Sequence, residues 1–157
     1  MNIEHILEQG SGQRNEDYLV LDRNIFGVFD GATSLDGACF GGGESGGALA
    51  SSIAGRTFLR NHHPLLRLGV EANDAIRAGM ESCRVDVSRR RGLWSASAAV
   101  VRLRDGAVEW FQTGDCQVVF IDGDGGFRMP AAREDHDYPT LRMIRERGRR
   151  HPEVQAL

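Results

Sequence analysis

The sequence predicts an α+β domain in which helices pack on an antiparallel sheet. Apolar segments of strand length occur in neighbouring pairs joined by short polar turns, and two segments with helical periodicity separate the first pair from the later strands. The resulting order, β-β-α-α-β-β-β, lacks the regular strand–helix alternation of a doubly wound parallel sheet. With 157 residues, the chain is long enough for one domain with its own core.

The first predicted hairpin joins a strand over 18–21 to a strand over 25–29 through a short polar connection. Helical spacing of apolar residues then predicts a helix over 48–58. Pro64 can open a second helix at its first turn. The apolar face of this second helix is expected to run on to the arginines and glycine of 89–92, which would close it; its members are Ala72, Ile76, Met80, Cys83 and Val87.

Three more strands are predicted over 94–103, 108–113 and 117–121. Asp105-Gly106, between the first two of these, is a strong signal for a tight hairpin turn. A short strand over 127–129 follows a glycine-rich turn, and the tail from 138 to 150 is expected to form an arginine-rich surface helix.

Composition excludes several kinds of chemistry. All 19 basic residues are Arg, so a Walker-type phosphate loop, a pyridoxal Schiff base and a Ser-Lys hydrolase each lack their Lys. The net charge of −3 argues against general nucleic-acid binding. The amino terminus lacks the basic and apolar pattern of a signal peptide, and no segment is apolar enough to span a membrane, so we expect a cytoplasmic protein. The three cysteines, with no CxxC pair, are expected to be reduced.

Acidic residues stand where predicted strands begin or end. Glu16 and Asp17 precede the first strand, Asp30-Gly31 follows the second, and Asp115 follows the strand over 108–113. A carboxylate in such a place projects from a rigid scaffold, and an adjoining Gly lets a main-chain carbonyl approach a cation. Oxygen ligands of this kind suit Mg²⁺ or Mn²⁺.

These acids belong to a longer series of motifs that resembles the metal-dependent protein phosphatases of the PPM or PP2C family. The most specific part is the Asn-Glu-Asp run together with an apolar strand that ends in Asp-Gly. The resemblance extends from Arg14 to about His136, and it rests on segments 14–17, 26–34, 42–48, 97–101, 113–117 and 133–136.

The resemblance implies a β-sandwich flanked by helices in α-β-β-α layers, with a cluster of two Mn²⁺ or Mg²⁺ ions at one end. It implies hydrolysis of phosphoserine and phosphothreonine in a phosphoprotein substrate by a metal-activated water, with catalytic roles for Asp30, Glu16 and Arg14. Asp30 would bridge both ions, and Glu16 and the Gly31 carbonyl would serve one of them. Asp17 would lie beside the cluster, and Asp115 near a third, weaker metal position.

Two departures from the family pattern bear on activity. Ala32 follows Asp-Gly where the family often has His or Met, and alanine cannot donate a proton to the leaving group. The family also takes two further metal-binding aspartates from its carboxyl-terminal half, whereas none of the acids after Asp115 follows an apolar strand.

We therefore expect residues 1–157 to form a single, truncated phosphatase domain. The alternative is a phosphatase-like binding module with weak or no activity. A sandwich that stops early would also expose a sheet edge, so self-association is expected.

Other motifs were weighed against simpler interpretations. The GxSxG pattern around Ser45 suggests a serine hydrolase, but no strand precedes this serine. The glycine-rich stretch 122–126 resembles a calcium loop, yet the residues that follow do not match one, which favours a hairpin turn. His62 and His63 adjoin no other type of metal ligand in the sequence, so an inter-helix surface loop is favoured there. Trp94 and Trp110 are expected to pack in the core or on a sheet face.

Overall fold

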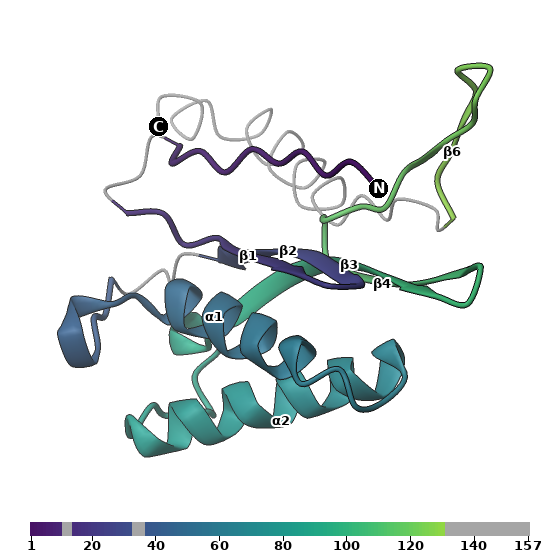
Figure 1. The fold of residues 1–157 in the computed structure, drawn as a ribbon. Helices are drawn as coiled ribbons and strands as arrows, with labels where there is room; N and C mark the ends of the chain where they lie inside the picture. Colours follow the sequence, from purple (N-terminus) through teal and green to yellow (C-terminus); the bar gives the residue numbers. More distant parts are fainter. Residues whose placement is uncertain (11–13, 33–36, 131–157) are drawn as a thin grey trace, which may run out of the picture.

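A computed structural model describes residues 1–10, 14–32 and 37–130, which form an antiparallel sheet with two helices on one face (Figure 1). The sheet has four strands in the order β1-β2-β3-β4, so strand order in space follows strand order in the sequence. The predicted α+β class with an antiparallel sheet is therefore confirmed. The strands are β1 (Tyr18–Asp22), β2 (Ile25–Ala32), β3 (Ser95–Arg104) and β4 (Ala107–Thr113).

Both predicted hairpins are present. Strands β3 and β4 are joined by Asp105 and Gly106, whose φ angles of +44° and +80° are those of a tight turn that matches the twist of the strands. Strands β1 and β2 pair from Tyr18 opposite Phe29 to Asp22 opposite Ile25. Strand β2 then pairs along its whole length with β3, which sets Asp30 opposite Ser97.

Helix α1 (Gly46–Leu59) packs directly on the sheet because its inner face carries small residues. Ser45 caps this helix, since its hydroxyl accepts a hydrogen bond of 3.1 Å from the Ala48 N–H. A Cβ at Gly55 would overlap the ring of Tyr18 on β1, so only glycine allows this approach. Within the described residues, no helix has both the length and the hydropathy needed to cross a membrane.

Helix α2 (Leu65–Ser82) is shorter than predicted. The expectation that its apolar face continues through Cys83 and Val87 to 89–92 is wrong, because the helix ends in a Schellman motif. Arg84 adopts a left-handed φ of +57°, and the Val85 N–H donates to the Met80 carbonyl over 2.9 Å. Glycine usually occupies this position at the end of a helix. Because Arg84 stands there instead, the sequence does not indicate that α2 ends here.

The predicted strand over 117–121 is also mostly wrong. Only β5 (Phe120–Ile121) is a strand there, and it pairs with β6 (Phe127–Arg128) in a separate two-stranded ribbon. The turn between them is the predicted hairpin turn, closed by a 2.7 Å hydrogen bond from the Asp122 N–H to the Gly126 carbonyl. The predicted tail helix over 138–150 lies outside the described residues.

The main core lies between the helices and the near face of the sheet. Its fully buried members come from both helices and from three strands, and they include Val20, Ile25, Phe29, Phe58, Leu65, Leu68 and Val100. Trp94 is buried in a second cluster, where it packs edge-on against Phe40. The prediction of a core or sheet-face position is thereby confirmed for Trp94.

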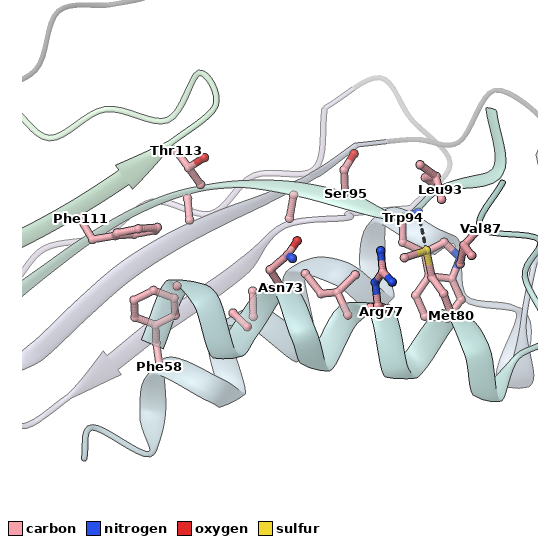
Figure 2. A pocket seen from close by; sticks show the side chains of 16 residues that line it. Phe58, Asn73, Arg77, Met80, Val87, Leu93, Trp94, Ser95, Phe111 and Thr113 are labelled. Carbon is pink, nitrogen blue, oxygen red and sulfur yellow. Dashed lines mark hydrogen bonds between the residues drawn. The ribbon is translucent and has the colours of Figure 1, made fainter. Parts of the chain in front are cut away.

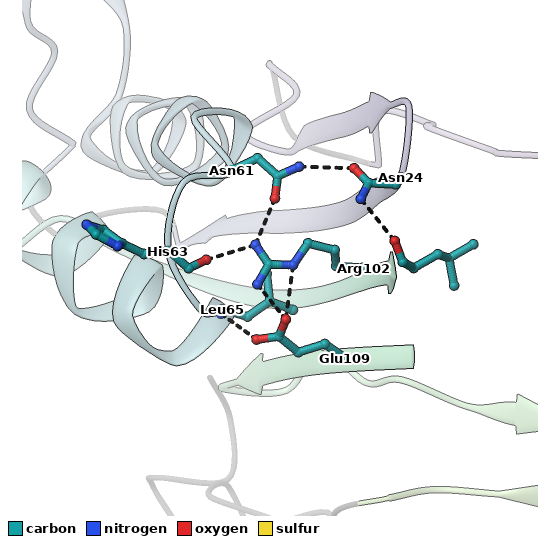
Figure 3. Close-up of polar contacts among 7 residues, drawn as sticks. Asn24, Asn61, His63, Leu65, Arg102 and Glu109 are labelled. Atoms are coloured by element: carbon teal, nitrogen blue, oxygen red, sulfur yellow. Dashed lines mark hydrogen bonds and ion pairs between the residues drawn. The ribbon is translucent and has the colours of Figure 1, made fainter. Parts of the chain in front are cut away.

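Arg102 is a buried cation in this near face, and its side chain is completely inaccessible to solvent. Its guanidinium donates to Glu109 on β4, to the Asn61 side-chain oxygen over 2.7 Å and to the His63 carbonyl over 2.8 Å (Figure 3). Glu109 also accepts a 2.7 Å hydrogen bond from the Leu65 N–H. Arg102 therefore ties the sheet to the connection between α1 and α2.

The far face of the sheet is apolar and partly exposed. Leu21, Val28, Val108 and Trp110 are between 37 and 46% exposed there. Figure 1 shows the amino-terminal segment crossing this side of the sheet, opposite the helices, and residues 1–4 border a groove there. We name this surface the open face. Among the described residues no second sheet covers it.

A cavity of about 380 Å³ lies between α2 and the near side of β3 and β4 (Figure 2). Phe58, Met80, Trp94 and Phe111 border it, together with Asn73 and Arg77 of α2. None of the acidic residues predicted to bind metal lines this cavity. The candidate site is therefore at the end of the sheet and not in this cavity.

Candidate metal centre

Asp30 lies near the end of β2, and its side chain points to the open face. Burial alternates along β2, with Ile25, Gly27, Phe29 and Gly31 buried, so Asp30 falls on the opposite side from the core. Its cross-strand partner Ser97 therefore shares that face. This arrangement places the Asp30 carboxylate at one end of the sheet, where it is accessible to an ion and to water.

The turn after β4 brings Asp115 to the same end of the sheet. The Asp115 N–H donates to the Ser97 hydroxyl over 3.4 Å, and a Cβ at Gly114 would overlap that hydroxyl. One carboxylate oxygen each of Asp30 and Asp115 and the Cys116 sulfur lie within 4.8 Å of one another. Two predicted ligands from non-adjacent strands thus converge on one small volume.

Asp17 and Glu16 approach this volume from the start of β1. Asp17 follows Asn15, whose side-chain oxygen accepts a 2.9 Å hydrogen bond from the Asp17 N–H. Burial raises the pKa of Asp30. The negative charges of Asp17 and Asp115 raise it further, as do a hydrogen bond with the Asp17 side chain and the charge of Glu16. The site therefore concentrates negative charge that a bound cation would offset.

Glu16 is positioned by the start of α1. Its carboxylate accepts a hydrogen bond from the Ser45 hydroxyl, and its main-chain carbonyl accepts one of 2.6 Å from Ser51. Gly31 lies against this segment, since a Cβ there would overlap the carbonyl oxygens of Glu16 and Gly47. Only glycine fits at position 31, which explains the Asp-Gly pair at the end of β2.

Arg14 contacts the glycine-rich loop that precedes α1. Its guanidinium donates to the Gly43 carbonyl, and its side chain is exposed. The catalytic role that the resemblance implies for Arg14 stays a prediction.

Cys116 lies at this site, whereas the sequence predicts only that its thiol is reduced. Burial raises the pKa of its thiol to about 11, with the charges of Asp30 and Asp115 adding to the effect. The group is therefore a neutral thiol at neutral pH and not a reactive thiolate. All three cysteines are free, as predicted. Its position next to Asp115 in the sequence was the only signal that could have found it.

Ser45 does not form a hydrolase elbow. The segment before it contains a short 3₁₀ turn, η1 (Gly41–Gly43), and an isolated bridge between Cys39 and Ser45 in place of a strand. Its hydroxyl is engaged with Glu16 and with the N-terminus of α1. The structure therefore agrees with the rejection of a serine hydrolase.

Comparison with known proteins supports the fold. No protein-family profile and no curated protein sequence matches the chain. Among solved structures, the serine/threonine phosphatase PstP/Ppp of Mycobacterium tuberculosis matches with a TM-score of 0.54 and 16% identity over 91% of this chain and 60% of that chain. The catalytic domain of PstP in complex with two manganese ions matches with a TM-score of 0.53 and 18% identity, over 93% of this chain and 59% of that chain.

The chain therefore has the fold of PP2C-type serine/threonine phosphatases, as the sequence resemblance implied. It spans about 60% of the length of the phosphatase chains it matches. At these identities the similarity establishes the fold alone.

Proposed function

We propose that this chain is a metal-dependent phosphatase domain that hydrolyses phosphoserine and phosphothreonine in proteins. The observation that carries the proposal is the convergence of Asp30, Asp115 and Asp17 at one end of a sheet with the PP2C-type fold. A similar structure is described as a complex with two manganese ions. Phosphoprotein substrates and a cytoplasmic location stay predictions.

The donor set fits Mn²⁺ or Mg²⁺. Carboxylate oxygens are the ligands these ions prefer, and burial together with the neighbouring charges of Asp17 and Asp115 raises the pKa of Asp30. Asp30 would be the ligand that both ions share, because it lies between Asp17 on one side and Asp115 on the other. Glu16 and the Gly31 carbonyl are the remaining predicted ligands. The neutral Cys116 thiol is a poor ligand for these hard cations.

Two bound ions would supply an activated water and a clamp on the phosphoryl oxygens. The chain's own contribution is to hold its carboxylates in place. Asp30 is fixed by the central strand β2, and Asp115 by its hydrogen bond to Ser97. Glu16 is fixed by Ser45, at the N-terminus of α1. Rigid placement of charge of this kind is the main protein contribution to phosphoryl transfer.

The experiment is hydrolysis of p-nitrophenyl phosphate by the purified chain with and without Mn²⁺. We expect Mn²⁺-dependent turnover that falls at least 100-fold in Asp30→Asn. Asp74→Asn is the matched control, because Asp74 is an exposed aspartate on α2 away from the cluster. Turnover that does not need Mn²⁺, or that survives in Asp30→Asn, would contradict the proposal.

A second candidate is a phosphatase-like binding module with little activity. Its support is Ala32, which follows Asp-Gly at the end of β2 and cannot donate a proton to the leaving group. Mn²⁺ binding without turnover in the experiment above would favour this alternative. Binding and turnover are therefore measured on the same preparation.

A further inference from the structure

The connection between α1 and α2 brings two histidines against a glutamate. His62 and His63 follow the end of α1, and Glu71 lies almost two turns into α2. The Nε2 atom of His62 is 3.4 Å from one carboxylate oxygen of Glu71, and the Nε2 atom of His63 is 3.6 Å from the other. The two histidines lie in the exposed connection between the helices, as predicted, and the fold adds Glu71 as a neighbour that is distant in the sequence.

The distance from each histidine nitrogen to its nearest Glu71 oxygen is close to the separation of neighbouring ligand atoms in a tetrahedral zinc site, and the two histidines contact different oxygens. Zinc bonds to histidine nitrogen and carboxylate oxygen are about 2.0–2.2 Å long, so neighbouring ligand atoms in a tetrahedron are roughly 3.3–3.6 Å apart. One ligand atom from each of His62, His63 and Glu71 lies within 4.8 Å of the others. Small side-chain rotations would complete such a site.

The backbone that carries the histidines is held in place before any ion binds. The His63 carbonyl accepts from the buried guanidinium of Arg102, which also bonds the Asn61 side chain (Figure 3). Asn61 in turn donates to Asn24 over 3.0 Å. The two rings are only 4.3 Å apart between their centroids. Because this backbone is already ordered, an ion that binds here loses little free energy to the ordering of the chain, which favours binding.

We propose that His62, His63 and Glu71 form a Zn²⁺ site, with water completing the coordination. Two imidazoles and one carboxylate favour zinc over magnesium and manganese, because imidazole suits zinc and the other two ions bind best to oxygen ligands. The three side chains are 44, 47 and 22% exposed, so an ion can enter from solvent.

This site is separate from the acidic cluster. Arg102, which holds the His63 carbonyl, pairs with Ile25 at the start of β2, whereas Asp30 lies near the other end of that strand. The two sites therefore occupy opposite ends of the sheet and offer different ligand chemistry. A bound zinc ion would link the α1–α2 connection to α2 and stabilise that corner of the domain against local unfolding.

Arg67 competes with the ion for Glu71. Its Nε lies 3.2 Å from the Glu71 oxygen that faces His63, and its side chain is 64% exposed. Zinc binding must break this contact. The cost is small, because exposed ion pairs of this type contribute little free energy. Removing the Arg67 guanidinium should therefore strengthen zinc binding.

The test is calorimetric titration of the full chain with Zn²⁺ in the presence of saturating Mn²⁺, so that the acidic cluster is already occupied. We expect one zinc equivalent with a dissociation constant in the low micromolar range, weakened at least tenfold in His63→Ala and in Glu71→Gln and tightened in Arg67→Ala. His5→Ala, at an exposed histidine outside the cluster, is the matched control.

Histidine-ring NMR identifies the ligands directly, and it does not depend on phosphatase activity. Zinc should shift the ring signals of His62 and His63 and leave that of His5 unchanged. Absence of zinc binding, or binding that is the same in the wild type, His63→Ala and Glu71→Gln, would overturn the proposal. Zinc bound by other histidines or by cysteines would leave the His62 and His63 signals in place and would overturn it as well.

Discussion

The Asp30 carboxylate on β2 and the Asp115 carboxylate after β4 lie within 4.8 Å of each other, although β3 separates their strands. The link between them is Ser97 of β3, which pairs with Asp30 across the sheet and accepts a hydrogen bond from the Asp115 main chain. Two acids that are distant in the sequence thus face the same small volume.

The pH dependence of metal-free stability should carry the signature of Asp30. Its pKa is raised in the folded state, so the folded state disfavours its ionised form. This penalty is absent below about pH 4, the range of an unfolded aspartate, and grows until the pH exceeds the raised folded pKa. Asp30→Asn removes it, so the variant's gain in melting temperature over the wild type should increase from pH 4 to neutral pH.

Thermal unfolding in the presence of a chelator measures this difference. Asp74→Asn serves as the control, and its difference from the wild type should show no such rise. A gain for Asp30→Asn that is constant with pH would show that neither burial nor repulsion from Asp17, Asp115 and Glu16 raises the pKa of Asp30 in the folded state.

The leaving group of the substrate should control turnover strongly. Ala32 follows Asp-Gly at the end of β2 and cannot protonate a departing alkoxide. Turnover on a series of aryl phosphates should therefore fall steeply as the pKa of the leaving phenol rises, and it should be weak on phosphoserine. A flat dependence would indicate that another group, such as the protonated Cys116 thiol or a bound water, supplies the proton.

The buried Arg102 should make Glu109 important for stability. Burial alone would raise the pKa of Glu109, but the hydrogen bonds from Leu65 and Arg102 outweigh this effect and lower it. Glu109→Ala leaves a fully buried guanidinium without its carboxylate, and breaking a buried pair in this way costs about 3–5 kcal/mol. Since Glu109 is partly exposed, we expect the lower end of that range in urea unfolding.

The control for Glu109→Ala is Asp122→Ala, which breaks the exposed Arg128–Asp122 pair and should cost less than about 1 kcal/mol. An equal effect of the two substitutions would mean that Arg102 is compensated without Glu109. The double variant Arg102→Met/Glu109→Leu should recover much of the lost stability, because it removes both charges together.

The open face should drive self-association of the isolated chain. Val28 and Trp110 are 45 and 37% exposed on it, and β1 and β4 are the two edges of the described sheet. We propose that a second copy covers this face, and we expect Val28→Glu to shift the population towards monomer in analytical ultracentrifugation. Leu66→Glu, at a 72% exposed leucine on α2, should leave association unchanged. A wild-type chain that is monomeric at high concentration would contradict this prediction.

Sequence patterns predicted the elements of this fold well wherever the local signal and the tertiary structure agree. The alternation in β2 and the Asp105-Gly106 turn are examples, because strand period and turn chemistry are local properties. The end of α2 was missed because Arg84 takes a left-handed conformation without glycine. That stop depends on hydrogen bonds back to the helix, for which the sequence carries no distinctive residue.

The two candidate sites show the same difference between features that follow from local sequence signals and features that depend on the tertiary structure. The acids at strand ends could be identified because their positions follow from strand boundaries. Cys116 and Glu71 could not, because their roles depend on which side chains the fold places nearby. Glu71 in particular is one of several acids on a helix surface, and only the path of the α1–α2 connection brings His62 and His63 to it.

Calorimetric titration of the wild type and Asp30→Asn with Mn²⁺ tests the central claim most directly. The account predicts that Mn²⁺ binds the wild type and that Asp30→Asn abolishes this binding, since loss of the shared carboxylate leaves neither ion adequately held. Asp74→Asn should bind as the wild type does. Equal Mn²⁺ affinities for the wild type and Asp30→Asn would contradict the assignment of this end of the sheet as the metal centre.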